Sequence, residues 1–390
     1  MEERFKFVQA YREEDFNFAE LCRRFGVSRK TGYKWVARYE LEGLEGLKDQ
    51  SRAPDRHPNE VLAEIAGQIL ESRRRHPHWG PAKLRVRLQR EAPEIVWPAT
   101  STIGEMLKRG GLTVARRHDR KAPPSQSPLS HAIAPNQVWS TDYKGWFRCG
   151  DGNRCDPFTL SDACSRFLFR CQAMESMDEW GTHGVMKATF RECGLPDAIR
   201  SDNGAPFASV GLGGLSGLSI WWIKLGIRPE RITPGKPQQN GRHERMHRTL
   251  KKATAMPPAA NLRIQQQEFD RFRQEYNWER PHEALQMKTP GEVYAPSERI
   301  YPSRIAGPEY NGEWEVRAVG PCGTMRWNNS KLFVGKAFAG ERIGLEPSGD
   351  GEWQLWFYGY PLAKLDERTG EIIEPKRRKQ KGPLVEPAGE

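Results

Sequence analysis

The sequence predicts a protein of several domains, with helical modules first, an α/β domain in the middle and a small all-β domain after it. Three observations support this order. The chain has 390 residues, which is too long for one ordinary domain. Apolar residues recur at helical spacing up to residue 115, whereas aromatic, alternating runs typical of strands begin at residue 137. Beyond residue 308, short strand-like runs are separated by Gly and Pro turns.

The first predicted module has the pattern of a helix-turn-helix. An apolar face from Phe18 to Phe25 predicts one helix, which Gly26 ends. Ser28 is then a suitable N-cap for a second helix. A plain helical hairpin is the alternative, but a basic second helix favours recognition of the major groove. The DNA contacts predicted here are Arg29, Lys30 and Lys34.

Helical periodicity returns after a linker rich in Gly, Pro, Asp and Arg. Pro81 suits the first position of a helix, and Thr100 or Ser101 suits the cap of another. The net charge of the chain is +11. Residues 61–130 carry 13 basic and 6 acidic side chains, so much of this excess lies here. A second helix-turn-helix-like module that binds DNA is therefore expected, with contacts from Lys83, Arg85 and Arg87.

A central α/β domain is predicted from three strands followed by alternating helices and strands. The expected strands cover residues 137–147, 156–163, 166–173, 197–202 and 227–232. The expected helices cover residues 178–193, 218–225, 237–256 and 263–280.

Three acidic residues in this domain lie at positions that suggest a functional role. Asp142 lies within an aromatic strand, although Asp is depleted in strands. Asp202 ends a short strand and precedes an Asn-Gly turn, at the sheet edge where α/β proteins place ligands. Glu244 lies in a predicted helix.

The helix that carries Glu244 has a polar face. Asn240, Glu244, His247 and Lys251 are spaced i, i+4, i+7 and i+11, so they are expected on one side. Lys251 would meet a phosphate group. By the same spacing His243 is expected to point away from Glu244, toward the surface or DNA, whereas a structural role is expected for His247.

Three carboxylates suit hard cations such as Mg²⁺, which take oxygen ligands and keep substrate phosphates in their shell. Two such ions can activate the attacking oxygen and neutralise the leaving oxygen of an in-line displacement at phosphorus. Asp142 would bridge both ions, and Asp202 and Glu244 would each complete one. Asp162 is a weaker candidate ligand, because a turn role explains it as well.

The strings around the acids are Trp139-Ser-Thr-Asp142, Arg200-Ser-Asp202-Asn203-Gly204 and Pro234-Gly-Lys-Pro-Gln-Gln-Asn240-Gly-Arg-His-Glu244-Arg-Met-His-Arg-Thr-Leu-Lys251. In this order they resemble the integrase-core (DDE) transposases of bacterial insertion sequences, which are relatives of retroviral integrases. The resemblance covers residues 135–295, and the helix-turn-helix front extends it over nearly the whole chain.

The resemblance implies an RNase H-like core that cleaves DNA at the ends of an element with two Mg²⁺ or Mn²⁺ ions. A freed 3′-hydroxyl would then join target DNA by transesterification. Matched residue by residue, the catalytic and metal-binding acids are Asp142, Asp202 and Glu244. Double-stranded DNA and further copies of the chain are the implied partners, and an accessory ATPase is left open. Further DNA contacts are expected from Asn240, Arg242 and Lys251.

Two departures from the family pattern concern the loops and the front end. The interval from Asp202 to Glu244 is longer than usual, and residues 211–218 are the expected insertion, placed in a loop. Such an insertion would leave the assignment of the acids intact but could change the contacts with target DNA. The front end lacks the His/Cys zinc module of retroviral integrases. A zinc site at Cys149 and Cys155 is a remote possibility beside an ordinary hairpin.

Two other functions compete with an active transposase. One is a catalytically inactive, transposase-derived regulator that only binds DNA, and the other is a metal-dependent nuclease on the same core. The presence of all three acids, with Asn240 and Lys251 in phase, argues against the regulator. The helix-turn-helix modules favour recognition of specific DNA ends over general nuclease activity.

The seven cysteines are scattered without a CxxC pair, which predicts reduced thiols. No secretory signal or membrane-length apolar run is apparent, so a cytoplasmic, nucleoid-associated protein is expected. The predicted segments are a helix-turn-helix domain (1–45), a linker (46–59), a second such domain (60–115), a basic linker (116–134), the catalytic core (135–300), a small β-barrel (308–372) and a charged tail (373–390).

Overall fold

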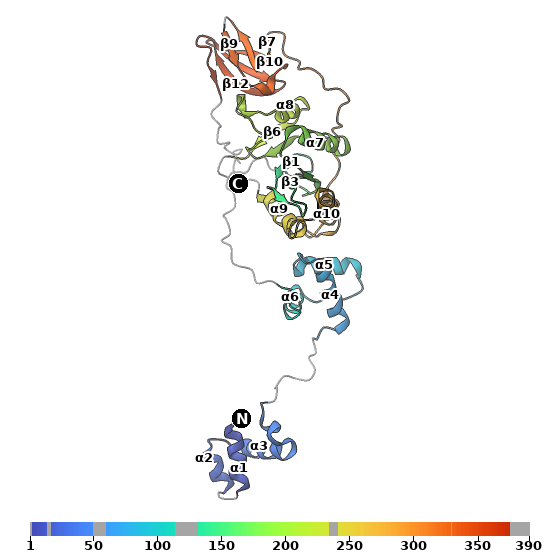
Figure 1. Ribbon diagram of the computed structural model, residues 1–390, viewed down its shortest axis with the longest axis vertical. Helices are drawn as coiled ribbons and strands as arrows, with labels where there is room; N and C mark the ends of the chain where they lie inside the picture. The colour runs from blue at the N-terminus through green and yellow to red at the C-terminus, as the bar shows by residue number, and fades with distance from the viewer. Residues whose placement is uncertain are drawn as a thin grey trace, which may run out of the picture. The chain divides into compact units, whose positions relative to one another are not determined.

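The computed structural model describes residues 2–13, 17–49, 60–113, 132–233, 241–328 and 330–374 (Figure 1). Most of the two predicted linkers and of the predicted tail lies outside these residues. The chain divides into two compact units, Met1–Leu62 and Ala63–Glu390. Among the described helices, none is both long enough and apolar enough to cross a membrane.

The first unit is a helix-turn-helix, as predicted. Its elements are α1 (Glu2–Arg12), α2 (Phe18–Arg24), α3 (Arg29–Glu42) and the 3-10 helix η1 (Gly43–Leu47). Gly26 has a φ of 65° in the turn, a conformation that glycine adopts without strain. The Ser28 side chain accepts a hydrogen bond from the Thr31 amide at 3.2 Å and so caps α3. Phe7, at 0% exposure, lies at the centre of the small core.

The second unit opens with three helices around a core of their own. They are α4 (Ala63–Arg75), α5 (Pro81–Glu91) and α6 (Thr100–Arg109). Pro81 occupies the first turn of α5, as predicted. The predicted cap of α6 was wrong, because Ala99 is the N-cap and no side chain caps this helix. Trp79, Leu84 and Ile103 are fully buried between the helices, so the module has a genuine apolar core.

A mixed sheet forms the centre of the second unit. Strand β1 pairs antiparallel with β3, and β3 pairs antiparallel with β4. On its other side β1 pairs parallel with β5, and β5 pairs parallel with β6. The single strand predicted over 137–147 is broken, because Gly145 turns the chain with a φ of 85°. The strands are β1 (Val138–Tyr143), β2 (Phe147–Arg148), β3 (Arg154–Asp162), β4 (Leu168–Met174), β5 (Ala198–Ser201) and β6 (Arg228–Arg231), in the order β2-β3-β1-β5-β6 with β4 on β3.

Helices cover both faces of this sheet (Figure 1). They are α7 (Glu179–Cys193), α8 (Gly217–Lys224), α9 (Gly241–Thr254) and α10 (Leu262–Gln274). Successive strand residues face opposite sides, so Phe169 packs with α7 and α8 whereas Leu168 packs with α9 and α10. The arrangement is the α/β, integrase-like core that the sequence predicts.

The C-terminal part is an open antiparallel sheet, so the predicted closed barrel is not confirmed. A five-stranded sheet runs β13-β12-β11-β10-β7, and β8 and β9 form a separate hairpin. Within the described residues its edge strands β7 and β13 do not pair with each other. The strands are β7 (Glu315–Ala318), β8 (Thr324–Trp327), β9 (Ser330–Phe333), β10 (Arg342–Gly349), β11 (Glu352–Phe357), β12 (Tyr360–Asp366) and β13 (Ile372–Ile373).

The central α/β domain covers the apolar side of this sheet, which explains why the sheet need not close on itself. Leu212, Leu215, Ile220 and Ile223 belong to one buried cluster with residues of β10, β11 and β12. Lys224 also pairs with Glu341 at 2.7 Å. The segment predicted as a loop insertion is therefore a platform: it forms the 3-10 helix η2 (Leu212–Gly214) and the start of α8, against which the C-terminal sheet packs.

We predict that Leu215→Ala weakens the attachment of the C-terminal sheet. Leu215 is 1% exposed, and truncation of a buried leucine costs about 2–5 kcal/mol of the free energy of unfolding. Denaturant unfolding and limited proteolysis within residues 300–314 would show the loss. Val210→Ala is the matched control, because Val210 is fully exposed nearby. Equal behaviour of the two variants would contradict the platform.

Candidate active site

Asp142 and Asp202 lie at the same edge of the central sheet. Asp142 is the fifth residue of β1, and Asp202 directly follows β5. The parallel register pairs Ser140 with Arg200, so it places Asp142 opposite Asp202 when continued by two residues. Opposed residues of neighbouring strands point to the same face. The sheet therefore brings together two acids that are 60 positions apart in the chain.

The turn after β5 holds Asp202 in place. Its Oδ1 accepts a hydrogen bond from the Gly204 amide at 3.1 Å, as expected for an aspartate at the start of an Asn-Gly turn. Burial raises the pKa of Asp202, and the Gly204 amide opposes this by stabilising the carboxylate. Within the described residues, no hydrogen bond involves the second oxygen, Oδ2.

Asp142 has the most perturbed carboxyl of the site. Burial first, and then the negative charges of Asp202 and Glu244, raise the pKa of Asp142 to about 7. The effect of Glu244 shows that the first turn of α9 lies within electrostatic range of the sheet edge. Glu244 itself is exposed. Two of the predicted acids therefore act on the third, Asp142. Within the described residues, however, no three His, Cys, Asp or Glu side chains converge closely enough to hold a metal ion.

Two histidines of α9 fasten this helix to the sheet. His243 and His247 are 3% and 4% exposed, and the Nε2 atom of each lies 2.7 Å from Thr159 Oγ1. The expectation that His243 faces the surface or DNA was wrong, because His243 is buried against β3. The structural role expected for His247 agrees with its burial and its hydrogen bond.

Thr159 is a site residue that sequence reasoning missed. It lies opposite Asp142 in the antiparallel pair of β1 and β3, and its hydroxyl donates to the Asp142 carbonyl oxygen at 3.0 Å. A hydroxyl has one proton, so it must accept from both imidazoles. His243 and His247 therefore carry their protons on Nε2. No sequence motif marks Thr159, because only the strand register reveals it.

The Nδ1 atom of His247 faces Asp142 Oδ2 at 3.7 Å. Burial, His243 and Lys144 lower the pKa of His247 far below its usual value. Burial lowers the pKa of His243 to about 3. Both imidazoles are therefore neutral near pH 7, and the approach of His247 to Asp142 is not an ion pair. The histidines position the site without cancelling its negative charge.

Asp162 has the turn role that was weighed against metal binding. It is 1% exposed, and its Oδ2 accepts hydrogen bonds from the Cys164 and Ser165 amides and the Ser165 hydroxyl. Its Oδ1 accepts from the Asn136 amide at 2.9 Å. Both oxygens of the Asp162 carboxylate therefore accept hydrogen bonds from the turn and its neighbours within the protein.

The predicted DNA contacts of the first module lie on the solvent side of α3, where Arg29, Lys30 and Lys34 are exposed. On α5, the Arg87 side chain instead pairs with Glu91 at 2.7 Å and lies 3.8 Å from Glu279 of the core. Burial and Arg280 lower the pKa of Lys83 to about 8.

Among the three predicted contacts on α5, Arg85 is the exposed one, and its side chain donates a hydrogen bond to the Pro98 carbonyl at 3.0 Å. On α9, Lys251 is exposed. Asn240 and the Arg242 side chain lie outside the described residues.

Family models match most parts of the chain. The matches are a helix-turn-helix domain at residues 3–55, a homeodomain-like domain at 31–107, integrase core domains at 132–237 and 225–290, and the C-terminal domain of IS481 family transposases at 314–373.

Two curated proteins are similar over long stretches. An insertion element IS407 protein of 31.7 kDa from Burkholderia multivorans is 28% identical over 303 residues, which is 72% of this chain and 92% of that protein. An insertion element IS476 protein of 39.2 kDa from Xanthomonas euvesicatoria is 27% identical over 211 residues, which is 50% of this chain and 54% of that protein.

Among solved structures, the catalytic core domain of HTLV-2 integrase in complex with magnesium is 14% identical with a TM-score of 0.33, covering 42% of this chain and all of that one. A simian T-cell lymphotropic virus intasome chain is 14% identical with a TM-score of 0.37, covering 75% of this chain and 98% of that one.

The matched domains follow one another in the order that the fold shows. Helix-turn-helix models cover the helical front, integrase core models cover the mixed sheet with its helices, and a transposase model covers the open C-terminal sheet. Together with the two insertion-element relatives, they show that the chain belongs to the insertion-sequence DDE transposases, which are built on an integrase core.

Proposed function

We propose that this transposase cuts DNA at the ends of its element and joins the freed 3′ ends to target DNA by transesterification. The observation that carries the proposal is that the β1–β5 register brings Asp142 and Asp202 to one sheet edge, where the charges of Asp202 and Glu244 both act on the Asp142 carboxyl. A carboxyl with a raised pKa beside two other acids is a candidate for a functional site. The negative charges of neighbouring carboxylates repel one another, and this costs free energy unless a bound cation offsets it.

The donor set fits divalent cations. Asp142, Asp202 and Glu244 offer only carboxylate oxygens, which Mg²⁺ and Mn²⁺ prefer. Positive charge would offset the burial and the repulsion from Asp202 and Glu244 that together raise the pKa of Asp142 to about 7. Two bound ions would activate the attacking oxygen and neutralise the leaving oxygen at phosphorus.

The chain's own residues would position the reacting groups. The Thr159 hydroxyl holds the backbone of Asp142 and, through His243 and His247, the helix that carries Glu244. Lys251, seven residues beyond Glu244 on α9, is exposed and would contact a DNA phosphate. Because the acids belong to a sheet and an anchored helix, their spacing would change little when DNA binds.

The helical modules would bring the DNA ends to this site. Arg29, Lys30 and Lys34 of α3 form an exposed basic face that suits the major groove. Lys83, Arg85 and Arg87 of α5 are the candidate contacts of the second module, and Arg85 is the most exposed of them. Joining two ends of an element to one target requires two active sites, so we propose that several copies of the chain assemble on DNA.

We predict that Asp142→Asn abolishes both cleavage and strand transfer with Mg²⁺ or Mn²⁺, while binding of element-end DNA persists. The substitution keeps the size of the side chain and removes a charged ligand. A gel assay on element-end and target DNA measures all three steps. Asp151→Asn is the matched control, because Asp151 is exposed in the β2–β3 turn.

The same assay separates the competing functions. Full activity of Asp142→Asn would contradict the assignment of the three acids as metal ligands. Wild-type protein that binds ends but never cuts would be a regulator, and protein that cuts but never joins would be a nuclease.

We predict that Thr159→Val slows cleavage by about 10- to 100-fold, as small displacements of reacting groups do. It should also lower the free energy of unfolding by about 1–3 kcal/mol for each imidazole N–H left unpaired. Thr159→Ser keeps the hydroxyl and should restore both values. The test compares the rate constant of cleavage with the affinity for end DNA. A purely structural role would lower stability but leave the rate constant of the folded protein unchanged.

A further inference from the structure

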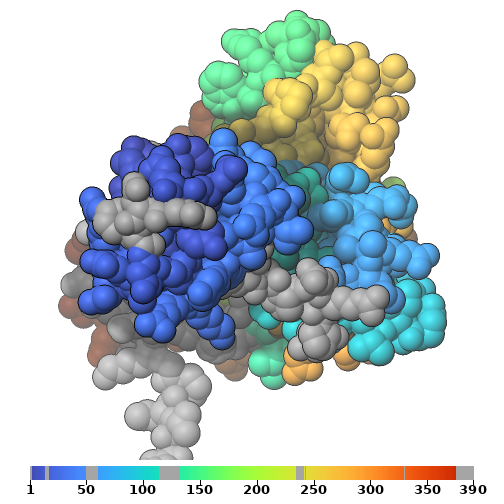
Figure 2. All heavy atoms as spheres, turned by 90° about the horizontal axis from the view of Figure 1, so that it is seen from below, coloured from blue at the N-terminus to red at the C-terminus, as the bar shows by residue number. Residues whose placement is uncertain are grey.

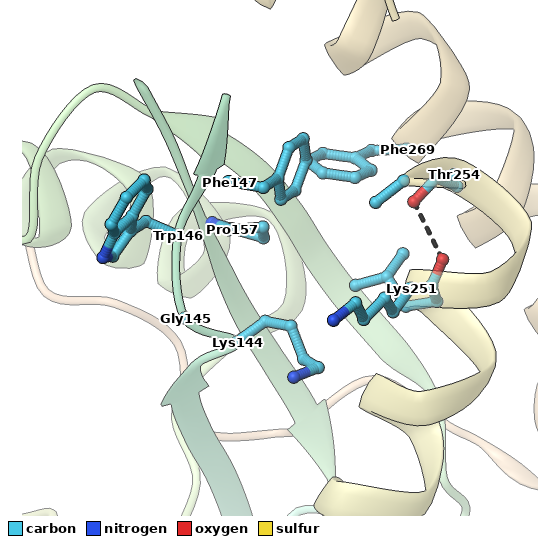
Figure 3. Close-up of a pocket in the computed structure, with 10 residues that line it drawn as sticks. Lys144, Gly145, Trp146, Phe147, Pro157, Lys251, Thr254 and Phe269 are labelled. Carbon is cyan, nitrogen blue, oxygen red and sulfur yellow. Dashed lines mark hydrogen bonds between the residues drawn. The ribbon is translucent and has the colours of Figure 1, made fainter. Parts of the chain in front are cut away.

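A pocket of about 290 Å³ lies next to the acids, between the β1–β2 turn and helix α9 (Figure 3). Lys144 and Trp146 line it from the turn, and Lys251 lines it from the helix. Phe147 and the buried Phe269 form part of its apolar lining. The proposed metal ligands do not line it, although the charge of Lys144 acts on the Asp142 carboxyl.

The pocket is positively charged. Figure 3 shows the side chains of Lys144 and Lys251 extending toward each other from opposite sides. None of the ten lining residues is acidic. Among the described residues, no carboxylate forms an ion pair with either lysine at 4.0 Å or less. Two ammonium groups without a paired carboxylate suit an anion such as a phosphate diester.

Trp146 is unusually exposed for a tryptophan, at 55%. The guanidinium groups of Arg148 and Arg154 lie over its ring, 5.8 and 5.2 Å from the centroid, and that of Arg154 also pairs with Asp156 at 2.5 Å. An exposed aromatic ring among cations is the arrangement on which single-stranded nucleic acids stack their bases. Trp146 therefore offers a stacking surface at the rim of a site for anions.

The position and size of the pocket limit what it can hold. Lys144 is two residues beyond Asp142, and Lys251 is seven residues beyond Glu244, about 10 Å along the helix axis. A group bound here would therefore be adjacent to the reacting phosphodiester. The volume lies at the small end of the range for ligand pockets, about 300–1,000 Å³. One nucleotide suits this space, whereas a base pair would not.

We propose that this pocket binds one unpaired nucleotide of the reacting DNA strand, with its phosphate between Lys144 and Lys251 and its base against Trp146. The inference rests on the proposed function, which makes DNA the substrate. It adds that the strand must separate from its complement at the active site. Trp146 and Lys144 are thus residues that select an opened end over an intact duplex.

Binding without metal tests the subsite separately from catalysis. Fluorescence anisotropy in EDTA compares a blunt duplex with the same duplex bearing a short single-stranded 3′ extension. Wild-type protein should prefer the extended duplex. Trp146→Ala should weaken binding of that duplex by about 5- to 150-fold, which is the contribution of one stacked base, and leave binding of the blunt duplex unchanged.

Three further variants sharpen the test. Trp146→Phe should retain most of the preference, because an aromatic ring remains. Trp180→Ala is the matched control, since Trp180 is an exposed tryptophan on α7, at 87%. Lys144→Ala should lower the slope of log K against log salt for the extended duplex by about 1, which corresponds to the loss of one phosphate contact.

The proposal is overturned if wild-type protein shows no preference, or if Trp146→Ala weakens both duplexes equally, as it would for a contact with the duplex itself. Loss of the preference in Trp180→Ala would also overturn it. If the preference holds while wild-type protein never cleaves DNA with Mg²⁺ or Mn²⁺, the subsite stands and the proposed catalysis fails.

Discussion

The parallel pairing of β1 with β5 is the constraint on which the site depends. It places Asp142 opposite Asp202 at the carboxyl edge of the sheet, where α/β folds present functional groups. Full burial of Trp139 and Ile199 fixes this register, because a slip of one strand by one residue would turn its apolar side chain to the opposite face. Core packing thus creates the repulsion between the acids that a bound cation would relieve.

The rest of the fold holds the other groups against this edge. Helix α9 packs on the sheet through Met246 and Leu250, and His243 and His247 converge on Thr159. The same helix exposes Glu244 and Lys251 beside this packed face. One helix therefore supplies an anchor, a candidate metal ligand and a candidate phosphate contact. The pocket beside it is formed by the same helix and the turn that ends β1.

Much of the domain organisation can be predicted from local sequence patterns. Gly26 and Ser28 mark the helix-turn-helix, and short strings around the three acids indicate an integrase core. Residues whose roles depend on tertiary contacts could not be found this way. The register of β1 with β3 reveals Thr159, and burial against β3 reverses the expected direction of His243. The open C-terminal sheet depends on Leu215 and its neighbours, which look like an ordinary loop insertion in the sequence.

The most direct test of the account is to locate manganese in crystals of the protein bound to element-end DNA, using the anomalous scattering of Mn²⁺. Anomalous peaks identify the ion without relying on activity. The account predicts two peaks at the edge of the sheet, ligated by Asp142, Asp202 and Glu244. Manganese bound elsewhere, or an edge occupied by no ion when DNA is in place, would contradict it.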